Sequence, residues 1–398
     1  MFEFCLHEDI FDGEWLVIAF YLLWQSYEFL FEGTRNPPIE KQRVNWEEHR
    51  HNLIQRGHFH RSYRMPPASF DILVGILGTT LVINPTKSYA RSKAGPIIPE
   101  IRLHCLMRYL AGGSYLDICT LVSIPHSTFY YILWKTCDAM NDCPQLEFSL
   151  PCTEAELNEA SAGFEGISCQ GIMRGCIGAI DGWLCPIQSP PTSVVGNVKT
   201  YFSGHYQRHG FNIQAIVDHL GRFLYIAVAA PGSQPDINAF NRTCLHSILS
   251  QLPLGFFILG DNAYKPSEYL VPIFGGADQL NVHHDNCNFF MSQCRIRVEM
   301  AFGMMVNWFG VLRSPLRVSI LNIGPLMQSI ARLHNFLLNE NNEYDPHQRQ
   351  PSQDMPLLPR NAETGQETNG NPAQPVDGIS VIREALVKRV REAGLTRP

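Results

Sequence analysis

The fold is decided by residues 174–183, which read Arg-Gly-Cys-Ile-Gly-Ala-Ile-Asp-Gly-Trp. The run from Cys176 to Ile180 is apolar and uncharged, which is typical of a strand buried on both faces. Asp181 follows at once, and Gly182 is expected to end the strand. A carboxylate at that point would lie at the rim of a sheet, where α/β folds place their chemistry. On this stretch alone, a plain Asp-Gly turn is the simpler interpretation.

The composition is that of a globular protein with few charges. Of the 398 residues, 45% are hydrophobic and 17% are charged, and the length allows two or more domains. The formal net charge is −6 and the pI is about 6.2. This balance argues against strong, autonomous nucleic-acid binding through bulk charge, but it leaves room for a local basic patch.

The cysteines and the most apolar run indicate where the chain resides. Twelve cysteines are scattered without a Cys-x-x-Cys pair, which favours a reducing compartment and small core residues. Residues 15–24 form the most apolar run, but it is shorter than the roughly 20 residues that a membrane span needs. Acidic residues precede this run instead of Lys or Arg, so we expect a docked helix, no signal sequence and no membrane role.

Changes in composition and periodicity divide the chain into six parts. These are an N-terminal helix with a polar connector (1–60), a helical domain (61–145), a linker (146–172), an α/β domain (173–340), a disordered linker (341–378) and a basic C-terminal helix (379–398). Within the helical domain, a short helix at 114–122 and a longer one at 127–140 have the outline of a helix-turn-helix. The longer helix offers Lys135 and few other base-reading side chains, so a packed helical bundle explains it as well.

The α/β domain shows several strands and three helices. Expected strands are 176–180, a hairpin partner at 183–188, 211–217, 222–229 and 255–260, and expected helices are 236–251, 291–309 and 321–340. The segments 141–170 and 262–290 are expected to be irregular.

Acidic residues at two strand ends and on one helix suggest a metal site. If the first and the last strand are neighbours, Asp181 and Asp261 meet at one sheet edge, and a helix packed there could present Glu299 to the same point. Three carboxylates without Cys or His ligands suit Mg²⁺ or Mn²⁺. Two such ions can activate a water or a 3′-hydroxyl to cut a phosphodiester. Arg295, one turn before Glu299, and the flanking Arg297 would bind backbone phosphates.

An ordered set of motifs resembles a known family. The motifs are Gly-Ala-Ile-Asp-Gly (178–182), Asn-Ile-Gln-Ala-Ile-Val-Asp (212–218), Ala-Pro-Gly-Ser-Gln-Pro-Asp (230–236), Leu-Gly-Asp-Asn-Ala-Tyr (259–264), Arg-Ile-Arg-Val-Glu-Met-Ala-Phe-Gly (295–303) and Leu-His-Asn-Phe (333–336). Tyr-Arg-Met (63–65) and Tyr-Leu-Ala-Gly-Gly (109–113) fit the same pattern upstream. In this order, they resemble the transposase-derived DDE endonucleases of PIF/Harbinger elements, including domesticated nuclear descendants.

The resemblance implies a nuclear DNA endonuclease with an RNase H-like catalytic domain, a mixed sheet flanked by helices. It implies metal binding by Asp181, Asp261 and Glu299, with Asp236 as a further ligand. In that family a separate Myb-like protein often supplies DNA binding, which would suit the acidic pI here, and a homo-oligomer is a further expected partner.

The chain also departs from the family pattern. Arg208 stands where a Lys is usual, and it joins the two helical arginines as an expected nucleic-acid contact. Trp183 replaces a common Thr and Asn262 a small residue. These departures favour an alternative, a domesticated adaptor that keeps the fold and binds a partner without cleaving DNA. A nuclease acting on RNA or without sequence preference is a third reading.

Several other polar residues have a structural explanation beside the functional one. Asp218 is expected to stabilise a turn, and Asp236 could cap the helix that it begins instead of binding metal. His283 and its neighbour His284 do not match standard zinc spacing, which favours a polar loop. The pair His334-Asn335 is expected to be a satisfied structural pair.

Overall fold

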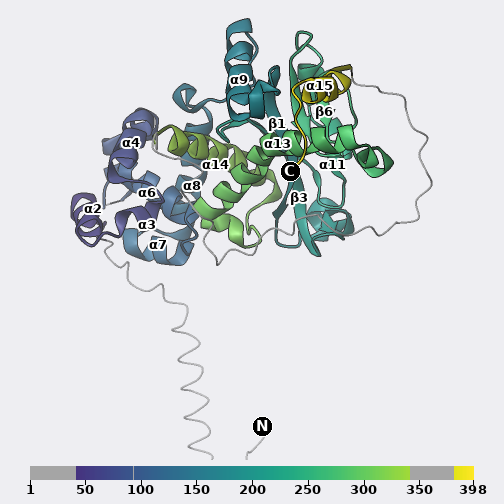
Figure 1. Ribbon diagram of the computed structural model, residues 1–398. Coiled ribbons are helices and arrows are strands. Elements are labelled where there is room, and N and C mark those ends of the chain that lie inside the picture. Colours follow the sequence, from purple (N-terminus) through teal and green to yellow (C-terminus); the bar gives the residue numbers. More distant parts are fainter. Residues whose placement is uncertain (1–41, 93, 341–380) are drawn as a thin grey trace, which may run out of the picture.

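The computed structural model describes residues 42–92, 94–340 and 381–398. The helix expected at 15–24 and the whole of the disordered linker expected at 341–378 lie outside these residues. Helical segments fill one side of the molecule and a sheet with flanking helices fills the other, as the purple-to-blue and teal-to-green parts of Figure 1 show.

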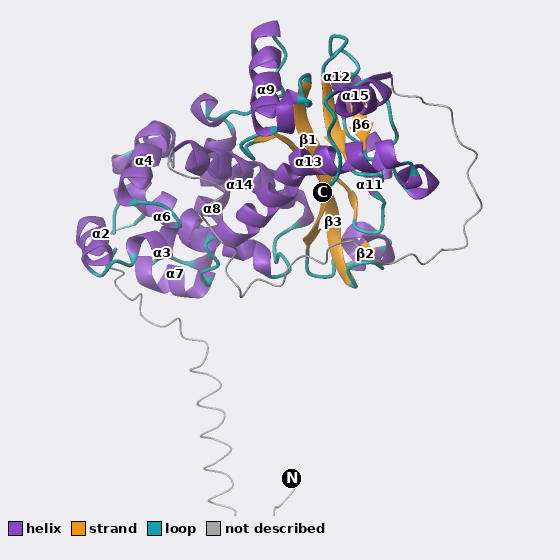
Figure 2. Ribbon diagram, viewed as in Figure 1, coloured by secondary structure: helices purple, strands orange, loops and turns teal. Residues whose placement is uncertain are grey.

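A curled mixed sheet with flanking helices forms the α/β part (Figure 2). Its six strands are β1 (Cys176–Pro186), β2 (Phe202–Ser203), β3 (Arg208–Val217), β4 (Phe223–Pro231), β5 (Phe257–Gly260) and β6 (Leu270–Pro272). The strands β4, β3 and β1 are antiparallel neighbours, and β5 and β6 continue the sheet parallel to β1. The short β2 pairs with the start of β3. The first and the last expected strands are therefore adjacent, which meets the condition for Asp181 and Asp261 to lie at one sheet edge.

Strand β1 differs from its prediction in one important way. It runs through Gly182 to Pro186, so Asp181 lies in the middle of the strand and not at its end. The expected hairpin partner at 183–188 was wrong, because its residues 183–186 continue β1 opposite residues 210–213 of β3. Pairing of Gly182 with Gln214 of β3 carries the strand through this glycine, and a single sequence does not reveal such a partner.

Helices cover both faces of the sheet. They are α9 (Glu154–Ile167), α11 (Asp236–Asn241), α12 (Leu245–Leu249), α13 (Val282–Trp308) and α14 (Ile320–Glu340), with a single turn α10 (Thr192–Val195). Short 3₁₀ turns are η1 (Pro144–Leu146), η2 (Cys169–Gly171), η3 (Val198–Tyr201), η4 (Gly276–Leu280) and η5 (Gly310–Arg313). The single helix expected at 236–251 is thus two short helices, whereas the helix at 321–340 is confirmed.

Two segments expected to be irregular contain helices. In the acidic connector, a capping box starts α9: the Thr153 hydroxyl accepts from the Glu156 amide, and the Glu156 carboxylate accepts from the Thr153 amide. Likewise α13 begins at Val282, well before 291, because Asn281 caps it by accepting from the His283 amide at 2.9 Å.

In the described part of the chain, seven α-helices come before α9. They are α2 (Trp46–Gln55), α3 (Phe59–Tyr63), α4 (Pro67–Leu81), α5 (Pro85–Arg91), α6 (Pro99–Leu110), α7 (Tyr115–Val122) and α8 (His126–Asn141). The longest of them, α8, packs against α4, α6, α7 and α14, and most of its apolar residues are buried, although Tyr131 is exposed. Lys135 on its exposed side forms an ion pair with Asp138. This packing favours the bundle over the base-reading interpretation, and the division of the chain into domains stays a prediction.

The buried side chains join these parts. One core runs from Trp46 and Phe70 in the N-terminal helices to Ala179 on β1 and Leu333 on α14. A second core includes Cys176 of β1 together with side chains of α9, β5, β6 and α13, and a third lies beneath α11 and α12. Strand β1 contributes to all three cores, so its position is fixed from both faces.

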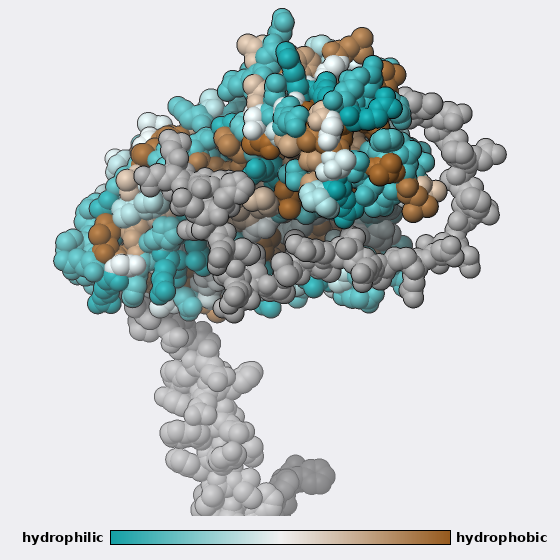
Figure 3. Space-filling view, in the orientation of Figure 1, coloured by the Kyte–Doolittle hydropathy of each residue, from teal (hydrophilic) through white to brown (hydrophobic). Residues whose placement is uncertain are grey.

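The expected C-terminal helix is present as α15 (Val381–Glu392). Leu386 and Val390 are buried in the second core, beside α13 and β6. Arg389 donates to the carbonyl oxygens of Ile172 and Arg174 at 2.7 and 2.8 Å, directly before β1. On the face shown in Figure 3, hydrophilic residues predominate in the described part, with apolar ones scattered among them. None of the described helices has the length and apolar character needed to cross a membrane.

Candidate active site

Asp181 is placed by the two strands on either side of β1. It lies opposite Ala215 of β3, and its Oδ1 accepts a hydrogen bond from the Gly182 amide at 2.8 Å. Its side chain is 18% exposed. Burial and the nearby charge of Asp261 raise the pKa of Asp181 to about 8, although the Arg295 guanidinium acts in the opposite direction. A carboxyl group in this state strongly favours a cation beside it.

Asp261 follows the neighbouring parallel strand β5 immediately. Ala179 of β1 pairs with Leu259 of β5, and two residues further along each chain are Asp181 and Asp261. Since alternate residues of a strand share a face, this register brings the two carboxylates to one place. Asp261 Oδ1 accepts from the Ala263 amide at 3.0 Å. Burial, followed by the charges of its acidic neighbours, raises the pKa of Asp261 against that hydrogen bond.

Glu299 reaches the same place from α13, which packs on β1, β3 and β5. Arg295 lies one turn earlier on this helix and forms the link between the acids. Its Nη2 is 2.6 Å from Glu299 Oε1, and its Nη1 is 3.8 Å from Asp181 Oδ2. The Arg295 side chain is 15% exposed and that of Glu299 is 45% exposed. The structure thus brings Asp181, Asp261 and Glu299 together, with a guanidinium between the first and the third.

Asp236 also belongs to this site. It is the first residue of α11, but this helix has no side-chain cap, so the capping alternative was wrong. Asp236 Oδ1 instead accepts from Asn212 Nδ2 at 2.7 Å and from Gln214 Nε2 at 3.2 Å. A Cβ atom on Gly182 would lie 1.8 Å from this oxygen, so the absence of a side chain at 182 makes room for Asp236.

Sequence analysis gave no role to the polar side chains that hold Asp236. Asn212 and Gln214 alternate on β3 and therefore point to the same face, which was the available signal. The buried Gln214 Oε1 also accepts from the Tyr264 hydroxyl at 2.7 Å. Burial and the charges of the three aspartates raise the pKa of both Tyr264 and the more exposed Tyr206. Tyr206, in the turn before β3, was also missed.

The other two predicted arginines lie apart from the carboxylates. Arg297 faces away on α13, where its charge acts on His219, and its carbonyl oxygen lies near Gly221. Arg208 is exposed at the start of β3 and donates from Nε to the Tyr206 carbonyl oxygen at 3.2 Å. Of the three, Arg295 is the one that contacts the acidic site in the described part of the chain.

The acidic site fits a divalent cation in the chemistry of its donors. Four carboxylates come from four elements, and mutual repulsion together with burial raises the pKa of Asp181 and Asp261. Such oxygen ligands suit Mg²⁺ or Mn²⁺. Among residues 42–92, 94–340 and 381–398, however, no group of three or more His, Cys, Asp and Glu side chains is already arranged to hold a metal ion. His283 and His284 lie in the first turn of α13, so the expectation of a polar loop there was wrong.

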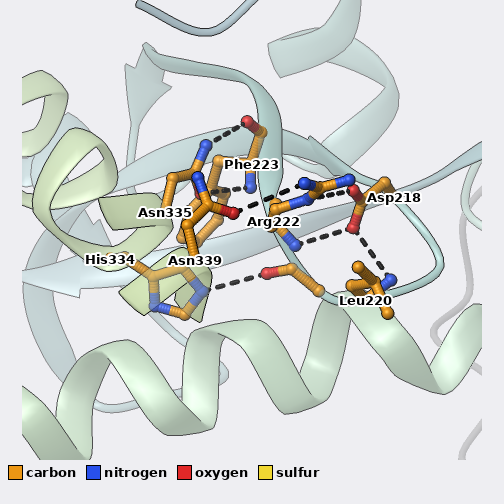
Figure 4. Close-up of polar contacts among 8 residues, drawn as sticks. Asp218, Leu220, Arg222, Phe223, His334, Asn335 and Asn339 are labelled. Carbon is orange, nitrogen blue, oxygen red and sulfur yellow. Dashed lines mark hydrogen bonds and ion pairs between the residues drawn. The ribbon is translucent and has the colours of Figure 1, made fainter. Parts of the chain in front are cut away.

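A second polar cluster, shown in Figure 4, is structural. Asp218 Oδ1 accepts from the amides of Leu220 and Arg222 at 2.9 Å, which confirms its turn role. His334 bonds through Nε2 to the Gly221 carbonyl oxygen at 2.9 Å, and Asn335 exchanges two hydrogen bonds of 2.8 Å with the backbone of Phe223. Both residues therefore have structural contacts, as predicted, but the buried Nδ1 of His334 has no hydrogen-bond partner, so only Asn335 is fully satisfied. Burial lowers the pKa of His334 to about 4, so it stays neutral.

Comparison with known proteins adds one positive finding. Searches of curated proteins and of solved structures gave no significant match. Residues 180–335 match the family model of the DDE superfamily endonucleases, and this interval begins one residue before Asp181 and contains Asp236, Asp261 and Glu299.

Proposed function

We propose that the protein is a divalent-metal-dependent DNA endonuclease of the transposase type. The observation that carries the proposal is the meeting of Asp181, Asp261 and Glu299 at one site, inside the segment that matches the endonuclease family. The strand order, with three antiparallel strands followed by two parallel ones, supports an RNase H-like domain. The motif order supports the PIF/Harbinger subfamily, and with it a nuclear location.

The acidic residues would hold Mg²⁺ or Mn²⁺, with Asp236 as a fourth ligand. When bound, such ions activate the attacking water or hydroxyl and stabilise the leaving oxygen of the phosphodiester. The chain itself orients the ligands: Asn212 and Gln214 fix Asp236 by hydrogen bonds, and the β1–β5 register sets the two other aspartates side by side. Pre-organised ligands of this kind are what phosphoryl chemistry requires.

DNA would be held by the chain's cations and by a partner. The proposed phosphate contacts are Arg208, Arg295 and Arg297. Tyr206 adds an exposed ring on which a base could stack, and it lies close enough to the three aspartates for their charges to raise its pKa. The net charge of −6 makes a separate DNA-binding protein, Myb-like in the subfamily that the motifs resemble, a further part of the proposal. A homo-oligomer that cuts both ends of an element is the proposed assembly.

A nicking assay tests the proposal. Full-length protein is mixed with Mg²⁺, terminal-repeat DNA and the partner protein, and nicked product is measured on denaturing gels. We expect Asp181→Asn and Glu299→Gln each to lower the cleavage rate at least about 100-fold, as is usual for loss of a central catalytic interaction. Asp71→Asn, which removes an exposed ion pair with Arg50, is the matched control and should cleave normally. Cleavage that survives Asp181→Asn would refute the assignment.

One observation favours a second candidate, a non-cleaving nuclear adaptor. Arg295 already supplies a counter-charge to Asp181 and Glu299, so the folded chain does not depend on a metal to neutralise them. Calorimetry with Mn²⁺ separates the two candidates. An endonuclease binds the ion and loses that binding in Glu299→Gln, whereas an adaptor shows no heat of binding in either protein.

A further inference from the structure

The guanidinium of Arg295 occupies a bridging position inside the acidic site. It is held by Glu299 at 2.6 Å on one side and approaches Asp181 at 3.8 Å on the other. The first contact is a close ion pair between a guanidinium and a carboxylate. The Nε atom of Arg295 is buried and has no hydrogen-bond partner, so the side chain contacts the acids through its two terminal nitrogens.

A guanidinium and a divalent cation satisfy the same need at this place. Both neutralise carboxylates, but while the guanidinium lies against the Glu299 and Asp181 oxygens it occupies space beside them that a metal ion would need. The described residues offer no ready metal cage although four carboxylates gather there. The presence of Arg295 between two of the acids gives a physical reason for this.

We propose that Arg295 is a built-in competitor of the divalent cation, which holds Asp181 and Glu299 in the metal-free protein and has to release them before the cation binds. This inference rests on the proposed metal-dependent function. Release needs only a change of side-chain rotamers, because Arg295 and Glu299 are four residues apart on the same face of α13. The backbone of the site stays where the strands fix it.

The arrangement has two consequences. Metal affinity is set below what four carboxylates would give alone, because each binding event breaks the Arg295 contacts. The metal-free fold is at the same time protected, because the guanidinium offsets repulsion among buried acids. Arg295 is therefore a positioning residue for the ligands, whatever contact it later makes with DNA.

Calorimetry on the full chain tests this. Protein freed of metal is titrated with MnCl₂ alone, as the wild type, as Arg295→Met and as Arg297→Met. Arg297→Met is the matched control, because it removes the same charge from the same helix on a side that faces His219. We expect Arg295→Met to bind Mn²⁺ about tenfold more tightly, which corresponds to about 1.4 kcal/mol. Arg297→Met should stay within about threefold of the wild type, since a charge outside the site is screened.

Thermal unfolding gives a second measurement that is independent of cleavage. In EDTA, Arg295→Met should unfold at a lower temperature than the wild type, and saturating Mn²⁺ should raise its midpoint by more than it raises that of the wild type. Should the Met variant fail to fold, Arg295→Lys serves instead. Its single ammonium cannot form the forked bridge, so a smaller tightening in the same direction is expected.

The outcomes separate this inference from the function on which it rests. Equal or weaker Mn²⁺ binding by Arg295→Met, with normal binding by the wild type, overturns the competitor role and leaves the endonuclease standing. An absence of Mn²⁺ binding in all three proteins refutes the metal-dependent function itself, and the inference with it. Equal tightening in Arg297→Met would reduce the effect to net charge and would also overturn the competitor role.

Discussion

At the scale of single residues, the ionisation of Asp181 couples the site to stability. The pKa of this carboxyl is raised from 3.8 to about 8 in the folded protein, first by burial and then by Asp261. Between these pH values the folded protein holds a proton that the unfolded chain has released. The free energy of unfolding in the absence of metal therefore falls as the pH rises from about 4 to about 8.

Asp181→Asn should consequently stabilise the metal-free protein at alkaline pH. The amide keeps the shape of the side chain but carries no charge to desolvate, so we expect the free energy of unfolding at pH 8 to rise by about 1–2 kcal/mol. At pH 4, where the wild-type carboxyl is already protonated when folded, the difference should shrink. Denaturant unfolding of both proteins at the two pH values measures this, and an equal effect at both would contradict the ionisation argument.

Gly182 makes a second prediction at this scale. A methyl group there would lie within 1.8 Å of Asp236 Oδ1, so Gly182→Ala should push Asp236 from its hydrogen bonds to Asn212 and Gln214. We expect DNA cleavage to fall about 10- to 100-fold, because misplaced ligands are costly in catalysis. Gly166→Ala, at a helical position with no atom within 4 Å of the new Cβ, is the control and should cleave as the wild type does.

The residue types of the site could be predicted from sequence, but their bonds could not. Asp181 and Asp261 each follow a short apolar run, which is typical of a buried strand, and Glu299 lies in a strongly helical segment. The bond from Arg295 to Asp181 joins α13 to β1, and no local pattern encodes a contact of that range. The charge of Arg295 and its position one turn before Glu299 predict a phosphate contact, which stays a proposal.

At the scale of elements, α14 is joined to the sheet by a side chain that forms the hydrogen bonds a neighbouring strand would form. Asn335 accepts from the Phe223 amide and donates to its carbonyl oxygen, as a neighbouring strand would. The periodicity of the sequence predicts that α14 is a helix with an apolar face. It does not predict that the backbone groups of β4 are the partners of this helix. Similarly, Gly182 suggested a strand end where β1 continues, because the pairing with β3 overrides local propensity.

Asn335→Ala should therefore loosen α14 from β4. Two backbone groups lose their partners, and we expect the free energy of unfolding to fall by about 1–3 kcal/mol. Asn339→Ala removes only a long contact of 3.4 Å with Arg222 at an exposed position, so it should cost less than about 0.5 kcal/mol. Urea denaturation monitored by tryptophan fluorescence compares the two, and equal losses would contradict the strand-like role of Asn335.

At the scale of the whole molecule, the C-terminal helix completes the core beneath the acidic site. Leu386 and Val390 pack with side chains of β1, β5 and α13, the elements that carry Asp181, Asp261 and Glu299. Composition identified this helix from its basic, amphipathic pattern, but the surface that receives it is built from segments about 100 residues or more earlier in the chain. Only the folded structure shows that relation.

Leu386→Ala should lower stability by about 2–4 kcal/mol, as is usual for a buried leucine. Because the same core supports β1 and α13, the variant should also bind Mn²⁺ more weakly under conditions where it is still folded. Val381→Ala, at an exposed position of the same helix, is the control and should change neither property. Calorimetry and thermal melts on the three proteins measure both effects, and a stability loss without any change in metal affinity would separate the helix from the site.

The docking of Arg389 on the carbonyl oxygens of Ile172 and Arg174 has a consequence for biosynthesis. The ribosome completes β1 about 200 residues before it begins the helix that contacts the segment before this strand. A nascent chain therefore lacks the contacts of Arg389 with residues 172 and 174 until translation has passed residue 389. Under the proposed function, full cutting activity is then expected only from chains whose synthesis has gone beyond that point.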